Sequence, residues 1–249
     1  MIELKTEGEI EIIKNNGRIL ARTLELVEEK IRPGMKTKDL DRLAEDFIKN
    51  QGGYPAFKGY RGFPCSICIS INEEVVHGIP GERVIEEGEI VSVDIGVFKD
   101  GYYADAAHTY PVGQVSAEAQ RLIEVTQQAL GNAFRFVREG KYISDISHAI
   151  QSLVEESGFS VVRDLVGHGI GKRMHEEPQI PNFGSPGQGV MLKKGMVLAI
   201  EPMVNAGSFE IETKDDQWTI VTRDGSLSAH FEHTIAVTEN GAEVLTKEG

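Results

Sequence analysis

The sequence is poor in cysteine, in positive charge and in long apolar runs. Only two of its 249 residues are cysteines, which excludes a framework of disulfides. Lys and Arg number 26 against 39 Asp and Glu, and the net charge of −13 disfavours stable binding to nucleic acid or to an anionic membrane surface. Charges interrupt the apolar residues of the N-terminal stretch, so neither an export signal nor a membrane span is expected. These absences predict a soluble protein of the cytoplasm.

The two cysteines are close in sequence. Cys65 and Cys68 have the spacing of a redox pair or of half a zinc site, but no second Cys or His pair follows at zinc-finger spacing. In a regular strand, their opposite parity would send the two side chains to opposite faces. We therefore expect no paired function, and at most one of the two thiols in a pocket.

Apolar periodicity predicts helices in both halves of the chain. Apolar residues between Ile10 and Ile31 recur at helical spacing, and Arg32-Pro33-Gly34 ends that helix. Three further helices are expected to begin at the N-cap residues Thr37, Ser116 and Ser144.

An internal repeat organises these elements. Three pairs of similar residues are each 107 positions apart, namely Thr37 and Ser144, Gly88 and Gly195, and Asp94 and Glu201. Such a constant offset predicts one domain, 1–249, made of two similar halves at about 1–112 and 113–249. The expected fold class is α+β, with helices covering one face of a curved, mostly antiparallel sheet and the functional site in the cleft between the halves.

A β-hairpin is expected to bring two carboxylates together. Asp94 lies in an apolar run rich in β-branched residues, and a second extended run begins at Tyr102. A two-residue loop at Asp100-Gly101 would make Asp105 the diagonal neighbour of Asp94, whereas a four-residue loop would place the two acids directly opposite. Both loops put the carboxylates on one face. The alternative is a solvent-facing Asp105 and a capping Asp94.

Two further acids and a histidine extend this set. Glu201 ends an apolar strand at the position equivalent to Asp94, and Glu232 stands near the start of another. Four carboxylates in one cavity would repel one another strongly, and two divalent cations would neutralise them. His168, between glycines, is free to join them. Oxygen ligands with one imidazole suit manganese, iron or cobalt, with zinc as an alternative, and two such ions can activate water and polarise a carbonyl for hydrolysis.

Five motifs in order resemble those of the type I, bacterial methionine aminopeptidases, over nearly the whole chain. They are Asn72 to Pro80, Val93 to Gly96 with Asp105, Gly167 to Pro178, Ile200 to Pro202, and Phe231 to Thr234. The resemblance implies the duplicated pita-bread fold and a cytosolic enzyme. Such an enzyme removes the initiator methionine from nascent chains and prefers a small second residue.

The resemblance also implies roles for individual residues. The metal ligands would be Asp94, Asp105, His168, Glu201 and Glu232, with Asp105 and Glu232 bridging both ions. His77 and His175 match two histidines that contact the scissile amide and the oxygen of the tetrahedral intermediate, and Glu201 matches a ligand that also takes a proton from water. The methionine pocket maps onto Tyr60, Phe63, Cys68, His77, Met174, His175 and Trp218. A monovalent cation is expected on backbone carbonyls near Asn72, Glu74 and Ser228.

Two alternatives stay open. An X-Pro aminopeptidase or prolidase of the same fold would share the metal ligands, but such enzymes usually carry a further N-terminal domain. A non-catalytic peptide binder of this fold would have lost its ligands, whereas all five are present here. The expected partners are the N-termini of nascent polypeptides, with transient ribosome association, no membrane, no stable nucleic-acid binding, and a monomeric state.

Overall fold

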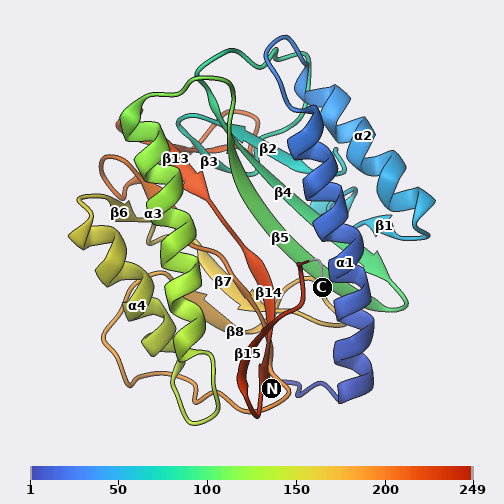
Figure 1. The fold of residues 1–249 in the computed structure, drawn as a ribbon, viewed down its shortest axis with the longest axis vertical. Coiled ribbons are helices and arrows are strands. Elements are labelled where there is room, and N and C mark those ends of the chain that lie inside the picture. Colours follow the sequence, from blue (N-terminus) through green and yellow to red (C-terminus); the bar gives the residue numbers. More distant parts are fainter. Residues whose placement is uncertain (1, 248–249) are drawn as a thin grey trace.

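The computed structural model describes residues 2–247, in which four long helices and two 3-10 turns accompany short strands (Figure 1). The helices are α1 (Glu7–Lys30), α2 (Thr37–Asn50), α3 (Ala117–Ala133) and α4 (Ile143–Glu156), and the 3-10 turns are η1 (Tyr60–Gly62) and η2 (Phe134–Phe136). The strands are β1 (Tyr54–Pro55), β2 (Cys68–Ile71), β3 (Glu74–Val76), β4 (Ile90–Lys99), β5 (Tyr102–Pro111), β6 (Ser160–Val161), β7 (Val166–Gly169), β8 (Glu176–Pro181), β9 (Val197–Ile200), β10 (Met203–Asn205), β11 (Ile211–Thr213), β12 (Ile220–Thr222), β13 (Ser228–His230), β14 (His233–Thr238) and β15 (Gly241–Val244). No helix in this range is long and apolar enough to cross a membrane.

The first helix follows its amphipathic pattern. Thr6 caps α1 with a capping box, in which the Glu9 carboxylate accepts from the Thr6 backbone amide. The helix ends at Lys30, just before the Arg32-Pro33-Gly34 segment that was predicted to end it. Its apolar side chains pack into a core that also includes β4 and β5. The helix predicted between Ile10 and Ile31 is therefore confirmed, with one more turn at its start.

Of the three predicted N-caps, only Ser116 is correct. Its hydroxyl accepts from the Ala119 amide at 3.1 Å. Lys36 and Tyr142 occupy the cap positions of α2 and α4, so Thr37 and Ser144 lie just inside those helices.

Distant chain segments explain the two wrong caps. The Thr37 amide donates to the Arg83 carbonyl, and the Ile143 amide donates to that of Val190. Because these acceptors cap the helix ends, the hydroxyl of Thr37 is free to bond Gly81.

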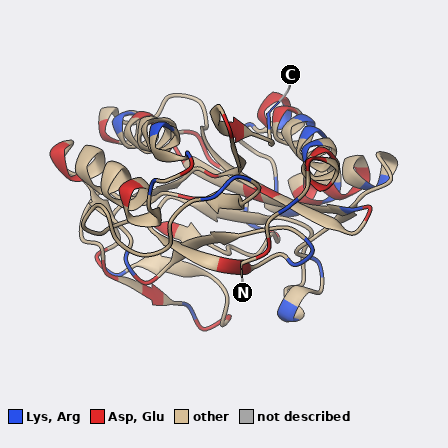
Figure 2. Ribbon diagram, turned by 90° about the horizontal axis from the view of Figure 1, so that it is seen from below, with Lys and Arg blue, Asp and Glu red and all other residues tan. Residues whose placement is uncertain are grey.

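The strands form four antiparallel sheets on one side of the helices (Figure 2). The largest has the order β15-β14-β9-β7-β8, and another joins β1, β2 and β5 around β4. The two remaining sheets have the orders β13-β10-β6 and β11-β12-β3. The predicted fold class, α+β with mostly antiparallel strands covered by helices, is confirmed.

The hairpin of β4 and β5 has the two-residue loop. Lys99 pairs with Tyr102, and both loop residues, Asp100 and Gly101, have positive φ, which matches the twist of the strands. Asp94 then pairs with Ala107 and Asp105 with Gly96, so the two acids are diagonal neighbours. The four-residue alternative is wrong.

The same hairpin separates a helix face from a site face. The hydroxyls of Tyr102 and Tyr110 reach Glu9 and the Leu24 carbonyl of α1, at 2.6 and 3.0 Å. Side chains of opposite parity on β5, including Asp105, therefore point away from α1. Asp105 faces the interior of the sheet layer rather than the helices.

A short contact between β5 and the start of β14 joins the two parts of the molecule. Ala107 and Glu232 exchange both backbone hydrogen bonds, at 3.3 and 2.9 Å. Next to them, the Thr234 hydroxyl accepts from the Asp105 amide and donates to the Asp105 carbonyl. This contact fixes Asp105 and Glu232 side by side.

Candidate metal centre and substrate pocket

Five separate strands or strand ends deliver the predicted ligands to one place. Asp94 lies in the middle of β4, Asp105 in β5 and His168 in β7, while Glu201 directly follows β9 and Glu232 directly precedes β14. All five line one cavity of about 140 Å³. The structure thus brings together every residue that the sequence nominated as a metal ligand.

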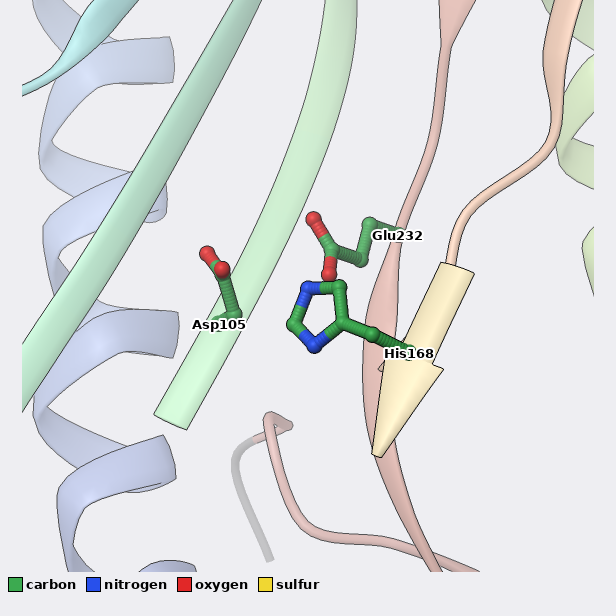
Figure 3. A group of neighbouring side chains, drawn as sticks. All are labelled: Asp105, His168 and Glu232. Atoms are coloured by element: carbon green, nitrogen blue, oxygen red, sulfur yellow. The ribbon is translucent and has the colours of Figure 1, made fainter. Parts of the chain in front are cut away.

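Asp105, His168 and Glu232 form the tightest part of this set (Figure 3). Each offers a ligand atom, and these atoms lie within 4.8 Å of one another. The imidazole Nδ1 of His168 lies 2.9 Å from the carbonyl of Gly169, to which it donates as the neutral ring. The lone pair of Nε2 then faces the carboxylates, with Glu201 Oε1 at 3.7 Å. A hydrogen bond that fixes the tautomer in this way is typical of a metal-binding histidine.

The four carboxylates are buried beside one another. Burial raises the pKa of Asp94 to about 7 and that of Asp105 well above its ordinary value, the latter with help from the charges of Glu232 and Asp94. Burial and neighbouring acids likewise raise the pKa of Glu201 and Glu232. Among the described residues, one oxygen on each of Asp94, Asp105 and Glu232 is buried with no hydrogen-bond partner. Four clustered acids, three of them with a buried unpartnered oxygen, together with one imidazole fit divalent cations.

Two non-ligand histidines face the same cavity. Tyr60 places its hydroxyl 2.8 Å from Nδ1 of His175, and the two rings stack at 5.4 Å. Burial, with the nearby His168 and Arg61, lowers the pKa of His175 to about 3. Burial also lowers the pKa of His77, which holds its backbone at a φ of 60°. Both imidazoles are therefore neutral near pH 7.

Aromatic rings and a thiol complete the wall. Phe63 and Trp218 meet edge to face at 5.2 Å, and Tyr60 and Cys68 also line the cavity. Cys65 is outside it, with its thiol 3.6 Å from the Pro80 carbonyl. One cysteine of the pair thus lines the pocket and the other does not.

Comparison with known proteins assigns the chain to a family. Residues 11–239 match the model of metallopeptidase family M24. The chain belongs to this family. It is 55% identical to methionine aminopeptidase 1 of Bacillus subtilis over 247 residues, covering 99% of this chain and 100% of that one.

Solved structures of similar fold were also found. A methionine aminopeptidase from Thermotoga maritima superposes with a TM-score of 0.98 at 51% identity, and each chain is covered completely. A prolidase from Pyrococcus horikoshii, at 23% identity and a TM-score of 0.80, shares the fold alone, and this chain covers 64% of it. The resemblance to methionine aminopeptidases and their pita-bread fold is confirmed.

One expected pocket residue of this M24 chain lies elsewhere. Met174 is buried and is not among the residues that line the cavity. A Cβ on Gly96 would come within 2.9 Å of its methyl and within 2.8 Å of Phe57. Met174 therefore packs against β4 at Gly96, beside Phe57, because the glycine leaves room for it. Phe57 lines the cavity instead.

Sequence reasoning missed two polar groups near the metal centre. Arg61 lines the cavity from η1, where the loop gave no periodic signal. His230 is buried, its Nε2 has no hydrogen-bond partner among the described residues, and this atom lies 3.7 Å from Glu201 Oε2. The sequence could have indicated His230 as a neighbour of the metal centre, since it lies two residues before the predicted ligand Glu232.

The residues named for a monovalent cation do lie together. The Ser228 amide donates to the Asn72 carbonyl at 2.8 Å, and Asn72 has a φ of 58°. The Glu74 carboxylate turns back to accept from the Ile71 amide. Asn72, Glu74 and Ser228 thus form one local group.

Proposed function

We propose that this chain hydrolyses the first peptide bond of polypeptides that begin with methionine, with a preference for a small second residue. The observation that carries this proposal is the convergence of four buried carboxylates and His168 beside a small aromatic pocket. Full-length similarity to methionine aminopeptidases supports the substrate. The X-Pro alternative is not favoured.

Two divalent ions are assigned to Asp94, Asp105, His168, Glu201 and Glu232. Asp105 and Glu232, held side by side by the contact of β5 with β14, are the proposed bridging ligands. Manganese, iron or cobalt suit these donors, with zinc as the alternative. When bound, such ions activate water and polarise a carbonyl. Glu201 is the proposed proton acceptor at this site.

The hydrogen bond from Tyr60 gives His175 a defined role. If the phenol donates to Nδ1 of a neutral ring, the imidazole proton is on Nε2. His175 then donates from Nε2 to the carbonyl oxygen of the substrate, where negative charge develops during hydrolysis. His77, also neutral, is the proposed second contact to the scissile amide.

The pocket proposed for the methionine side chain is formed by Tyr60, Phe63, Cys68 and Trp218, with Phe57 added by the structure. The whole cavity, which the metal ligands also line, has a volume of about 140 Å³ and is small beside the roughly 300–1,000 Å³ typical of pockets for larger ligands. A flexible, unbranched thioether fits an apolar cavity of this size.

The cellular setting follows from this reaction. The proposed partners are the N-termini of nascent chains in the cytoplasm, met by a monomer with transient ribosome contact and no stable nucleic-acid binding. A monovalent cation near Asn72, Glu74 and Ser228 and the duplication of halves 1–112 and 113–249 stay predictions.

A peptide assay with metal analysis tests the proposal. Met-Ala-Ser should be cleaved in a divalent-dependent manner, and Met-Leu-Ser much more slowly. Asp105→Asn should lose at least one ion, measured by elemental analysis. His77→Ala should lose turnover with its metal content unchanged. Bound ions without cleavage would favour a peptide binder, and faster cleavage of Ala-Pro-Ser than of Met-Ala-Ser would favour the X-Pro alternative.

A further inference from the structure

Arg61 is a cation held at the mouth of the cavity. It lies inside η1, between Gly59 and Gly62, and its backbone has a φ of 50° and a ψ of 19°. Its guanidinium lies 5.5 Å from the centre of the Tyr60 ring, and Tyr60 in turn bonds His175. The side chain is exposed, yet it is among the residues that line the cavity.

In the part of the chain that the structure describes, no acidic side chain forms an ion pair with Arg61. The Arg61 guanidinium contacts the Tyr60 ring, and its charge helps to lower the pKa of His175. Arg61 is also the only Lys or Arg among the cavity-lining residues, in a protein whose net charge is −13. Acidic residues are spread widely over the ribbon (Figure 2). The positive charge of Arg61 at the entrance of the cavity therefore contrasts with the negative net charge of the protein.

The small cavity determines what meets this cation. A volume of about 140 Å³ holds one side chain, so the substrate residues after the scissile bond lie outside it. An extended chain advances about 3.3–3.6 Å per residue, which carries the third and fourth residues across the rim. A guanidinium presents paired N–H donors whose geometry matches a carboxylate.

We propose that Arg61 binds a carboxylate of the substrate beyond its second residue, and so favours peptides with Asp or Glu at the third or fourth position. The C-terminal carboxylate of a short peptide has the same chemistry. This inference rests on the proposed function, because it assumes that the methionine side chain fills the cavity.

The experiment measures kcat/KM for Met-Ala-Xaa-Ser-NH2 and Met-Ala-Ser-Xaa-NH2, with Xaa as Asp, Gln or Lys. In the series whose Xaa position meets Arg61, kcat/KM for the Asp peptide should exceed kcat/KM for the Gln peptide by about 1.5- to fivefold at low salt, as expected for an exposed ion pair. Raising the salt to about 0.5 M should reduce the ratio, because the pair is screened. Comparing Met-Ala-Ser as free acid and as amide separates a terminal carboxylate from a side-chain one.

Charge variants decide the outcome. In Arg61→Gln the ratio of kcat/KM for the Asp and Gln peptides should fall to one. In Arg61→Glu the Lys peptide should become the preferred substrate. Arg61→Lys should keep part of the preference for the Asp peptide. Arg135→Gln is the matched control, since Arg135 is an exposed arginine in the other 3-10 turn, η2. A ratio that stays the same in Arg61→Gln and Arg61→Glu would overturn the proposal. Failure of the wild type to cleave the Gln peptides would overturn the proposed function as well, which separates the two results.

Discussion

At the scale of single residues, burial and mutual repulsion make it costly in free energy to ionise the four carboxylates, and bound metal ions would lower that cost. Asp94, Asp105, Glu201 and Glu232 all have raised pKa values, with burial as the largest cause. The folded state without metal thus holds protons that the unfolded chain, with carboxyl pKa values near 4, releases. The ions would replace these protons.

In metal-free protein the stabilising effect of protonated Asp94 should therefore be lost as the pH rises from about 4, the pKa of its carboxyl in the unfolded chain, to about 7, its folded pKa. The buried histidines, whose lowered pKa values act in the opposite direction below about pH 6.5, are the same in the wild type and in Asp94→Asn, so the difference between the two proteins isolates the carboxyl group. Each proton released costs about 1.4 kcal/mol per pH unit, or a few degrees of Tm. Thermal unfolding with a chelator and with manganese measures the effect. The Tm of the metal-free wild type relative to that of Asp94→Asn should fall over this range, and a difference that rises with pH would contradict the argument.

A second prediction concerns the orientation of His175. Tyr60→Phe removes only the hydroxyl that bonds Nδ1, so the ring remains to line the pocket. We expect kcat to fall about tenfold or more, with KM and metal content nearly unchanged, because the proton of His175 is no longer fixed on Nε2. Phe63→Leu is the comparison variant, and it should raise KM instead. Equal kcat in Tyr60→Phe and the wild type would remove the hydroxyl from the mechanism.

At the scale of elements, local sequence signals predicted what depends on neighbours in sequence. The apolar, β-branched run around Asp94 and the Asp100-Gly101 turn predicted the hairpin and the shared face of Asp94 and Asp105, because strand pairing follows the turn. Met174, by contrast, does not line the cavity. It packs into the space beside Gly96, which is 78 positions away in sequence. A contact of this kind depends on the assembled sheet and has no local signal.

The wrong N-caps have the same origin. Thr37 has the residue type of a cap, but the carbonyl of Arg83 already accepts from its amide, so the hydroxyl serves another chain segment. Residue type predicts a cap well where solvent is the competitor, as at Ser116. It predicts a cap poorly where a distant backbone supplies the acceptor.

A glycine inside α1 gives a prediction at this scale. A Cβ on Gly17 would lie 2.1 Å from the Leu245 carbonyl oxygen, so the helix touches the C-terminal segment there. Gly17→Ala should lower the free energy of unfolding although alanine favours helices. Gly131→Ala in α3, where no atom lies within 4 Å, should raise it by about 0.5–1 kcal/mol. Urea unfolding measures both, and stabilisation by Gly17→Ala would refute the contact.

At the scale of the whole molecule, the site depends on contacts between segments far apart in sequence. Glu232 is brought beside Asp105 by the backbone hydrogen bonds between Glu232 and Ala107. Lys5, near the N-terminus, forms an ion pair with Glu176, next to His175. The Glu176 carboxylate also accepts from the Arg173 amide at 3.1 Å. The N-terminal segment thus holds the loop that carries a proposed catalytic histidine.

The last prediction tests this long-range support. Both side chains of the Lys5–Glu176 pair are 4% exposed, so Lys5→Met leaves a buried carboxylate without its cation. We expect a loss of about 3–5 kcal/mol in the free energy of unfolding, as is typical for one half of a buried pair. The double variant Lys5→Met/Glu176→Leu should regain much of it, because no uncompensated charge then remains. Lys194→Met, which breaks an exposed pair with Glu239, should cost less than about 1 kcal/mol. If Lys5→Met costs no more than this control, the ion pair does not hold the loop and His175 is positioned by Tyr60 alone.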